Sequence, residues 1–234
     1  MLIKTPQQAI KERGIIPASY IPNLYCLFDE MMSDGSMQDD VGGVRYTPNN
    51  TFTVNGDHTV KLSDSSAIAT YYPTTNKTIA ATTDLVSFLV ASRTLTGSSD
   101  LTTFNFGKGT GSGIVNRQTD DGTGALIHDG VGSLTASPAM TPAAASDYIL
   151  LVAVLDRDVG VFGYYYNLTT DSVIGDGSSA GVLSNPLVPS SFIKIANCEK
   201  LLQAGIFTFP SNGLPATWKA DMVGLGKAAV AARG

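Results

Sequence analysis

The clearest pattern in the chain is a pair of dense apolar runs separated by a short charged connection. Residues 149–155 are seven consecutive apolar residues, and residues 159–167 form a second run that is rich in valine and tyrosine. β-Branched and aromatic side chains favour strands, so the pattern predicts a buried β-hairpin. The first run is apolar on both faces, which indicates a strand packed between two layers. It is far shorter than the roughly 20 residues that a membrane-spanning helix needs.

Shorter runs with alternating apolar and polar residues recur along the rest of the chain. Asn55 and Gly56 separate two of them and predict a tight hairpin, because both residues tolerate positive φ. Residues 114–115 and 125–128 are expected to be edge strands. The other predicted strands are residues 24–28, 51–54, 58–62, 67–71, 84–93, 101–106, 191–196 and 204–209. The predicted loops are residues 31–43, 136–146 and 171–189.

The N-terminal segment combines a short helix with an extended arm. Thr5 can cap the helix, Pro6 fits its first turn and Gln8 completes a capping box, while Gly14 ends it. Residues 15–22 are apolar and contain prolines, which favour extended backbone in the residues before them. Such an arm does not fold alone, so it lies either on its own domain or on a neighbouring subunit.

The C-terminal segment predicts an amphipathic helix, because apolar residues recur there three and four positions apart. Gly224 and Gly226 are expected to break or weaken it. The apolar positions are Leu214, Trp218, Met222, Leu225 and Ala229. The patterns together predict an all-β protein with an antiparallel β-sandwich at residues 23–210, an N-terminal helix and arm at residues 1–22, and a helical tail at residues 211–234.

Composition favours many short strands and argues against a nucleic-acid surface. Charged residues make up 15% of the 234 residues, and the net charge is −5 at pH 7. Nucleic-acid affinity depends on Lys and Arg that neutralise phosphates, so we expect no such partner. Residues 1–8 lack the apolar core of a signal peptide, which predicts a protein used in a cytoplasm. Cys26 and Cys198 lie in apolar strand contexts that favour free buried thiols over a disulfide.

Candidate catalytic and metal-binding residues are scattered along the chain. His58 and His128 are its only histidines, and its three glutamates lie far apart. We therefore expect no metal, no cofactor and no enzyme activity, because a zinc site or a glycoside hydrolase needs grouped ligands or paired carboxylates. Asp156 and Asp158 flank Arg157, and we expect all three to form a solvated turn in which the acids pair with the arginine.

Two further motifs are weak matches to known binding loops. Residues 107–113 are rich in glycine and contain Lys108, but the glycine spacing of a phosphate-binding loop is absent, so we expect a flexible turn. Asp34, Asp39 and Asp40 share one loop and could attract calcium. Their spacing does not fit an EF-hand, and a solvated loop is the favoured interpretation.

The order of the predicted elements resembles the laminin-G-like, concanavalin A-like jelly roll. The resemblance covers residues 84–223. It rests on the apolar strand that follows Tyr148, the next strand that ends Tyr-Tyr-Tyr-Asn at Asn167, and the late strand at residues 204–209 before a short helix. It implies a β-sandwich. The Trp-His-His sequence with which this family often opens the middle strand is absent here.

Low charge, abundant Thr, Gly and Ser, and the apolar arm also resemble structural proteins of tailed-phage virions. This resemblance implies a non-enzymatic capsid decoration or cement protein of a virion assembled in the host bacterial cytoplasm. Its partners would be other virion proteins and copies of itself, with no membrane contact. The residues expected to dock on partners are Ile10, Ile15, Ile16, Tyr20, Ile21, Trp218 and Met222.

The alternative hypothesis is a carbohydrate-binding or receptor-binding module, such as a tail fibre or tail accessory protein. Side chains alternate along a strand, so Tyr164 and Tyr166 share one face and Tyr165 points to the other. Tyr164 and Tyr166 would contact the glycan. At least one of the three tyrosines is expected to belong to the core.

Overall fold

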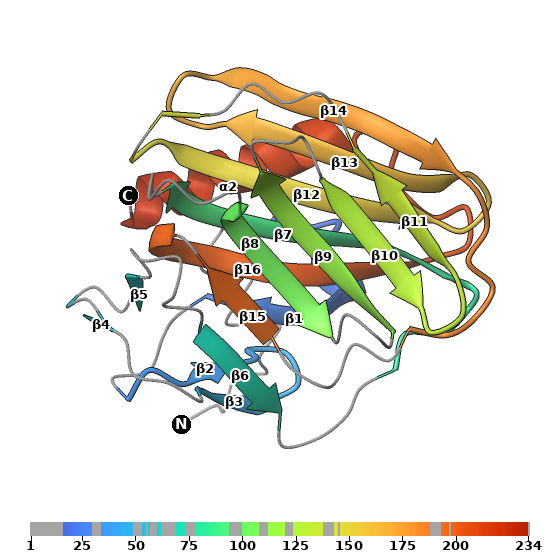
Figure 1. Cartoon of the computed structure of the whole chain (residues 1–234), viewed down its shortest axis with the longest axis horizontal. Helices are drawn as coiled ribbons and strands as arrows, with labels where there is room; N and C mark the ends of the chain where they lie inside the picture. Colours follow the sequence, from blue (N-terminus) through green and yellow to red (C-terminus); the bar gives the residue numbers. More distant parts are fainter. Residues whose placement is uncertain are drawn as a thin grey trace.

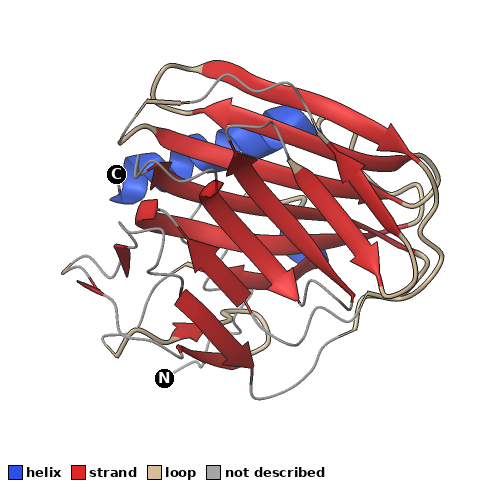
Figure 2. Cartoon of the chain, viewed as in Figure 1, coloured by secondary structure: helices blue, strands red, loops and turns tan. Residues whose placement is uncertain are grey.

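In the computed structural model, two antiparallel β-sheets face each other and a helix covers the outer face of one of them (Figure 1, Figure 2). The predicted N-terminal helix, His58 and residues 108–111 lie outside the described part of the chain. The structure describes residues 16–29, 34–48, 53–54, 56, 60–61, 69–73, 78–93, 100–107, 112–119, 124–137, 143–144, 146–187, 193–196 and 198–233.

The six-stranded sheet has the order β1-β16-β7-β12-β13-β14, and all of its neighbouring strands are antiparallel. β12 lies inside the sheet, between β7 and β13, as its two-sided apolar pattern predicts. The bounds are β1 (Leu24–Phe28), β7 (Thr83–Arg93), β12 (Tyr148–Asp156), β13 (Gly160–Asn167), β14 (Ser172–Ala180) and β16 (Cys198–Pro210).

The eight-stranded sheet has the order β11-β10-β9-β8-β15-β6-β3-β2. β4 (Thr53–Val54) and β5 (Val60–Lys61) form a separate antiparallel pair, which confirms a hairpin around Asn55 and Gly56, but its connection is residues 55–59 and is longer than a two-residue turn. The bounds of the eight strands are β2 (Met37–Gln38), β3 (Arg45–Pro48), β6 (Ala69–Pro73), β8 (Asp100–Gly107), β9 (Ser112–Thr119), β10 (Ala125–Asp129), β11 (Ser133–Ala136) and β15 (Ile193–Ala196).

Side chains along β12 alternate between two apolar cores. The inter-sheet core lies between the two sheets, and the outer core lies between the six-stranded sheet and the segments that cover it, η1 (Ile21–Asn23) and α2 (Trp218–Arg233). Residues 149–155 are fully buried. Ile149, Leu151, Ala153 and Leu155 enter the inter-sheet core, and Leu150, Val152 and Val154 enter the outer core.

Three predictions about strands were wrong. Residues 171–189 were predicted to be a loop, but they contain β14, an edge strand in which only Ile174 and Gly175 are buried. An edge strand of small polar residues carries almost no apolar pattern, because it depends on pairing with β13. Residues 114–115 and 125–128 lie in β9 and β10, which are interior strands, and the edge is β11.

The predicted C-terminal helix is confirmed, but its glycines do not break it. α2 continues through Gly224 and Gly226 to Arg233. Gly226 is buried, and a Cβ atom there would come within 3.0 Å of the Leu168 side chain. Close packing on the sheet therefore requires a small residue, and that packing outweighs the weak helix propensity of glycine. Among the described helices, none has the length and apolar character needed to cross a membrane.

The cysteines are packed between the two sheets, and the arm is packed on the outer face of the six-stranded sheet. Cys26 and Cys198 are free and buried, as expected, and burial raises the pKa of the Cys198 thiol to about 12. Ile16, Tyr20 and Ile21 belong to the outer core. The described part of the arm therefore lies on its own domain. The division of the chain at residues 22 and 210 stays a prediction.

Candidate functional site

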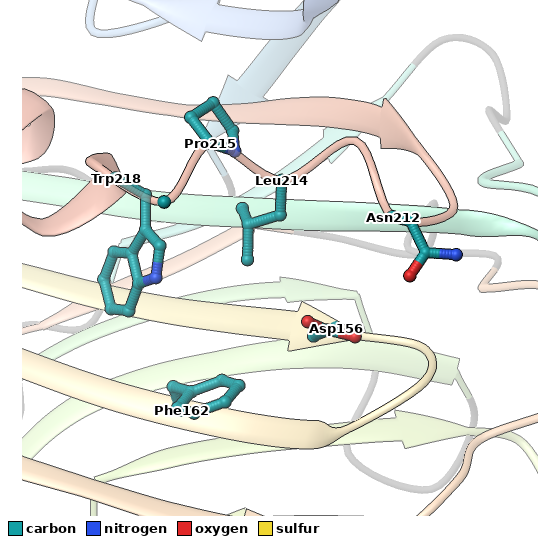
Figure 3. Close-up of a pocket in the computed structure, with 7 residues that line it drawn as sticks. Asp156, Phe162, Asn212, Leu214, Pro215 and Trp218 are labelled. Atoms are coloured by element: carbon teal, nitrogen blue, oxygen red, sulfur yellow. The ribbon is translucent and has the colours of Figure 1, made fainter.

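A pocket of about 310 Å³ opens at the end of the sandwich where β12 ends, β13 begins and the chain passes from β16 to α2 (Figure 3). We call this end the loop end. The pocket brings together residues from three separate parts of the sequence, and its wall is partly apolar and partly polar. The lining residues are Asp156, Phe162, Asn212, Leu214, Pro215, Ala216 and Trp218.

Trp218 forms the aromatic wall of the pocket. It is the first residue of α2 and is 8% exposed. Its ring packs on Phe162, with 6.3 Å between centroids, and meets the edge of Tyr164 at 5.8 Å. Figure 3 shows the ring nitrogen on the side that faces the pocket. Within the described residues this N–H donates no hydrogen bond, so it is available to a ligand.

Asp156 and Asn212 supply the polar part of the wall. Asp156 Oδ1 accepts hydrogen bonds from the backbone N–H groups of Asp158 at 3.0 Å and Val159 at 3.1 Å. Its Oδ2 accepts none within the described part of the chain. Asn212 has a φ of 61°, which asparagine tolerates better than most residues, and its amide lies across the pocket from Trp218 (Figure 3).

Hydrogen bonds join the two loops that carry these polar groups. Asp84 Oδ1 accepts the backbone N–H of Arg157 at 2.9 Å, and the Asp84 carboxylate also accepts the backbone N–H of Asn212. The Ser211 hydroxyl donates to Asp158 Oδ2 at 2.9 Å. The pocket is therefore held in shape without a ligand, as most small-molecule sites are.

The Asp84 carboxyl is completely buried. Burial raises its pKa above the usual value, and the charges of Asp156 and Asp158 act in the same direction, while the backbone hydrogen bonds oppose them. Among the described residues, Asp84 Oδ2 has no hydrogen-bond partner. The Asp84 carboxyl thus joins two loops, although burial and the neighbouring carboxylates disfavour its charged form.

Arg157 does not pair with the acids beside it, which corrects the prediction of a solvated turn. Its side chain is turned inward and only 5% of the residue is exposed. The guanidinium donates to four backbone carbonyls of neighbouring connections. The acceptors are Ala80 at 3.3 Å, Thr83 at 3.2 Å, Leu183 at 2.5 Å and Asn185 at 3.1 Å. Arg157 therefore fixes the loop end from inside.

Asp129 fixes the neighbouring turn in a similar way. Its carboxylate accepts the backbone N–H groups of Val131, Gly132 and Asn185 at 2.8–3.0 Å and the Asn185 amide at 3.2 Å. Burial raises the pKa of this carboxyl, but these hydrogen bonds outweigh burial and lower the pKa to about 2. The charged form therefore stabilises the folded state.

We expect Asp129 to make the protein sensitive to acid. A lowered pKa contributes stability that is present above the ordinary value of 3.8 and is lost as the pH falls toward 2. The Asp129→Asn variant should lose about 2 kcal/mol of unfolding free energy at neutral pH and part of its pH dependence below pH 4. Urea unfolding of both proteins from pH 7 to pH 2 measures the unfolding free energy as a function of pH. Parallel curves of free energy against pH for the two proteins would contradict the prediction.

Metal binding finds no support among the described residues. No group of three or more His, Cys, Asp or Glu side chains within the described ranges is arranged to hold a metal ion. In the loop considered for calcium, Asp39 is buried. Its two oxygens accept the backbone N–H groups of Leu27, Val41 and Gly42. Asp39 therefore organises its own loop.

The two tyrosines predicted to contact a glycan lie beside α2. Tyr164 is 7% exposed and packs in the outer core, so it offers little surface to a ligand. Tyr166 is half-buried and donates its hydroxyl proton to Asp171 Oδ1 at 2.7 Å. Tyr165 is fully buried in the inter-sheet core, as alternation predicts. A glycan contact of Tyr164 or Tyr166 stays a prediction, and neither lines the pocket.

The residues predicted to dock on a partner are buried within the chain wherever the structure describes them. The outer face of the six-stranded sheet is apolar and needs cover, and these side chains supply part of that cover. These side chains are covered within the chain, and their docking on a partner stays a prediction. The buried residues are Ile16, Tyr20, Ile21, Trp218 and Met222. Ile10 and Ile15 lie outside the described residues.

The prediction from sequence found one residue of the pocket, Trp218, and assigned it a different role. Asp156 was interpreted as part of a solvated turn. Phe162, Asn212 and Leu214 were missed as site residues, because only the fold brings them together. The sequence Asn212, Gly213, Leu214, Pro215 between a strand and a helix was the available signal.

No family model and no curated protein matches the sequence. Solved structures do share its fold. The botulinum neurotoxin serotype D ligand-binding domain in complex with N-acetylneuraminic acid has a TM-score of 0.54 and 14% identity, over 90% of this chain and 52% of that one. A second structure of the serotype D binding domain has a TM-score of 0.50 at the same identity and coverage.

The binding domain of Paraclostridial Mosquitocidal Protein 1 has a TM-score of 0.53 and 11% identity, over 87% of this chain and 52% of that one. The chain thus spans about half the length of each of these three structures. Identities this low establish the fold alone. That fold is the jelly-roll β-sandwich, which confirms the predicted fold class.

Proposed function

We propose that this protein is a non-enzymatic carbohydrate-binding module that holds its ligand in the pocket at the loop end. The observation that carries the proposal is the combination in one pocket of an aromatic N–H and a carboxylate oxygen that have no partner among the described residues with an exposed amide. Binding sites of this kind combine apolar walls with a few converging polar groups.

This set of groups matches the two kinds of surface on a sugar. The C–H face of a sugar ring is apolar and packs on aromatic and aliphatic side chains, here the partly exposed Phe162 and Leu214, beside the small exposed part of Trp218. Sugar hydroxyls donate and accept hydrogen bonds. Asp156 Oδ2 accepts, Trp218 Nε1 donates, and the Asn212 amide does both.

Two observations favour binding over catalysis. Asp156 is the single carboxylate in the lining, whereas glycoside hydrolases use two on opposite sides of the bond that they cleave. The structures with the same fold are described as binding domains, and one of them holds N-acetylneuraminic acid. They support a binding role for this chain.

Capsid decoration and a location in a virion stay predictions. They rested on the composition and on an apolar arm that could dock on a neighbour, and the described part of the arm is buried against its own sheet. A receptor that carries a glycan remains compatible with the pocket.

A glycan array with the full chain tests the proposal, and titration of the glycans that bind supplies the affinity. Trp218 is the sole tryptophan, so its fluorescence reports occupation of the pocket directly. Binding should change its emission. A blank array, or binding that leaves the emission unchanged, would contradict the proposed site.

The Asn212→Gly variant should weaken binding roughly threefold to tenfold, because one neutral hydrogen bond contributes about 0.5–1.5 kcal/mol. Glycine preserves the positive φ, so the loop keeps its shape. The matched control is Asn23→Ala, which removes an amide on η1, outside the pocket lining. Equal affinities of the two variants would argue against a ligand contact at Asn212.

A further inference from the structure

We infer that the pocket selects uncharged or cationic sugars and rejects acidic ones. This inference rests on the proposed function and specifies the class of ligand. It separates the chain from the serotype D neurotoxin domain, whose ligand, N-acetylneuraminic acid, carries a carboxylate. The inference follows from the negative charge at the pocket and from the ion pairs and hydrogen bonds that the neighbouring cations already make.

The pocket lining carries one charge, and that charge is negative. Asp156 is the only ionisable side chain among the lining residues. Asp158 lies two residues further along the same turn and is exposed. A carboxylate on a ligand would approach both of these groups, and like charges a few ångströms apart repel strongly in a site partly shielded from water. Asp156 Oδ2 instead favours a hydroxyl or an ammonium group.

Among the described residues, the two cations that adjoin lining residues in sequence, Lys219 and Arg157, already have partners. Lys219 Nζ lies 5.5 Å from the centroid of the Trp218 ring, but it is 2.6 Å from Asp176 Oδ2 and also lies over the Tyr164 ring at 5.2 Å. The Arg157 guanidinium is buried and bonded to backbone carbonyls. Neither group lines the pocket, so neither supplies the counter-charge that an acidic sugar needs.

The N-terminus of α2 does not change this conclusion. A helix N-terminus carries partial positive charge and favours anions. Here Asp221 lies in the first turn, and its Oδ2 accepts the hydroxyl protons of Thr217 at 2.7 Å and Tyr20 at 2.9 Å. The negative charge of Asp221 therefore offsets part of the positive charge of this helix terminus.

The size of the pocket limits the ligand to a short segment of glycan. At about 310 Å³ it lies at the lower end of the range for small-molecule sites. A pocket of this volume has room for a single sugar ring, and further rings would lie outside it. The pocket thus contacts one sugar unit, which is neutral or an amino sugar. The charge of that unit should decide which glycans bind.

Three sugars that differ in a single group test this inference. The probes are galactose, galacturonic acid, in which a carboxylate replaces the C6 alcohol, and galactosamine, with glucose, glucuronic acid and glucosamine as a second series. Titration of the full chain is followed by Trp218 fluorescence at low ionic strength. We expect the uronic acid to bind at least tenfold more weakly than the neutral sugar in the series that binds. Added salt should reduce this difference in affinity, because it screens the repulsion between charges.

The Asp156→Asn variant identifies the source of the selectivity. Asparagine keeps the Oδ1 acceptor that caps the turn, so the fold is preserved. In this variant the neutral sugar should bind only about threefold more tightly than the uronic acid, mainly because the uronic acid binds more tightly than it does to the unmodified protein. Asp158→Asn is the matched control, since it removes the same charge outside the lining, and its amide can still hydrogen-bond the Ser211 hydroxyl. It should reduce the difference in affinity less than Asp156→Asn does.

The outcomes separate this inference from the proposed function. Uronic acids that bind as well as their neutral counterparts would overturn the charge selectivity and leave carbohydrate binding intact. Selectivity that Asp156→Asn leaves unchanged would also overturn it, because another group would then be responsible. Binding of none of these sugars, together with a blank array, would overturn the proposed function and this inference with it.

Discussion

Replacing Arg157 with methionine is expected to lower the free energy of unfolding by about 3–5 kcal/mol. Arg157 is 5% exposed, and its guanidinium donates to four carbonyls of the connections around the loop end. Methionine fills much of the same volume but donates nothing, so several buried carbonyls lose their partners. Urea unfolding at pH 7 measures the loss. Ligand binding should weaken as well, because Asp156 precedes Arg157 in the same turn.

The matched control is Arg45→Met. Arg45 donates to Ser36 and pairs with Asp34, but its side chain is 47% exposed. Exposed ion pairs contribute little, so this variant should lose less than about 1 kcal/mol. If the two variants lost similar amounts, Arg157 would not have the structural role that its hydrogen bonds indicate.

The fold could be predicted from the sequence better than the pocket could, because burial of a strand leaves a local pattern and the inward orientation of a side chain such as Arg157 does not. Strands such as β12 were predictable, because burial on both faces requires an unbroken apolar run. β14 was not predictable in this way. It lies at the sheet edge and depends on pairing with β13, which leaves almost no apolar periodicity in its sequence.

The pocket depends on contacts that no local pattern encodes. Asp156 and Asn212 are far apart in sequence, and they meet because Asp84 accepts a backbone N–H from each loop. An acid beside an arginine in a turn indicates a surface ion pair when it is considered locally. Only the surrounding carbonyls of the folded protein draw the guanidinium inward and leave Asp156 in the pocket lining without it.

The Tyr20→Ala variant is expected to lower the free energy of unfolding of the isolated protein by about 3–5 kcal/mol. Tyr20 is fully buried, and its ring meets the edges of Phe207 at 5.0 Å and Phe209 at 5.5 Å. Its hydroxyl donates to Asp221 Oδ2 at 2.9 Å, which ties the arm to α2. Alanine would leave a cavity between the arm, the sheet and the helix.

Two further variants separate these contributions. Tyr20→Phe keeps the ring and removes the hydrogen bond to Asp221, so it should lose about 1 kcal/mol. Ser19→Ala alters an exposed neighbour in the arm and should change stability by less than about 0.5 kcal/mol. Thermal and urea unfolding of the isolated chain measure all three. An arm that served to dock on a partner would leave the stability of the isolated protein unchanged by Tyr20→Ala. A loss of several kcal/mol would establish that this part of the arm belongs to the core of its own domain.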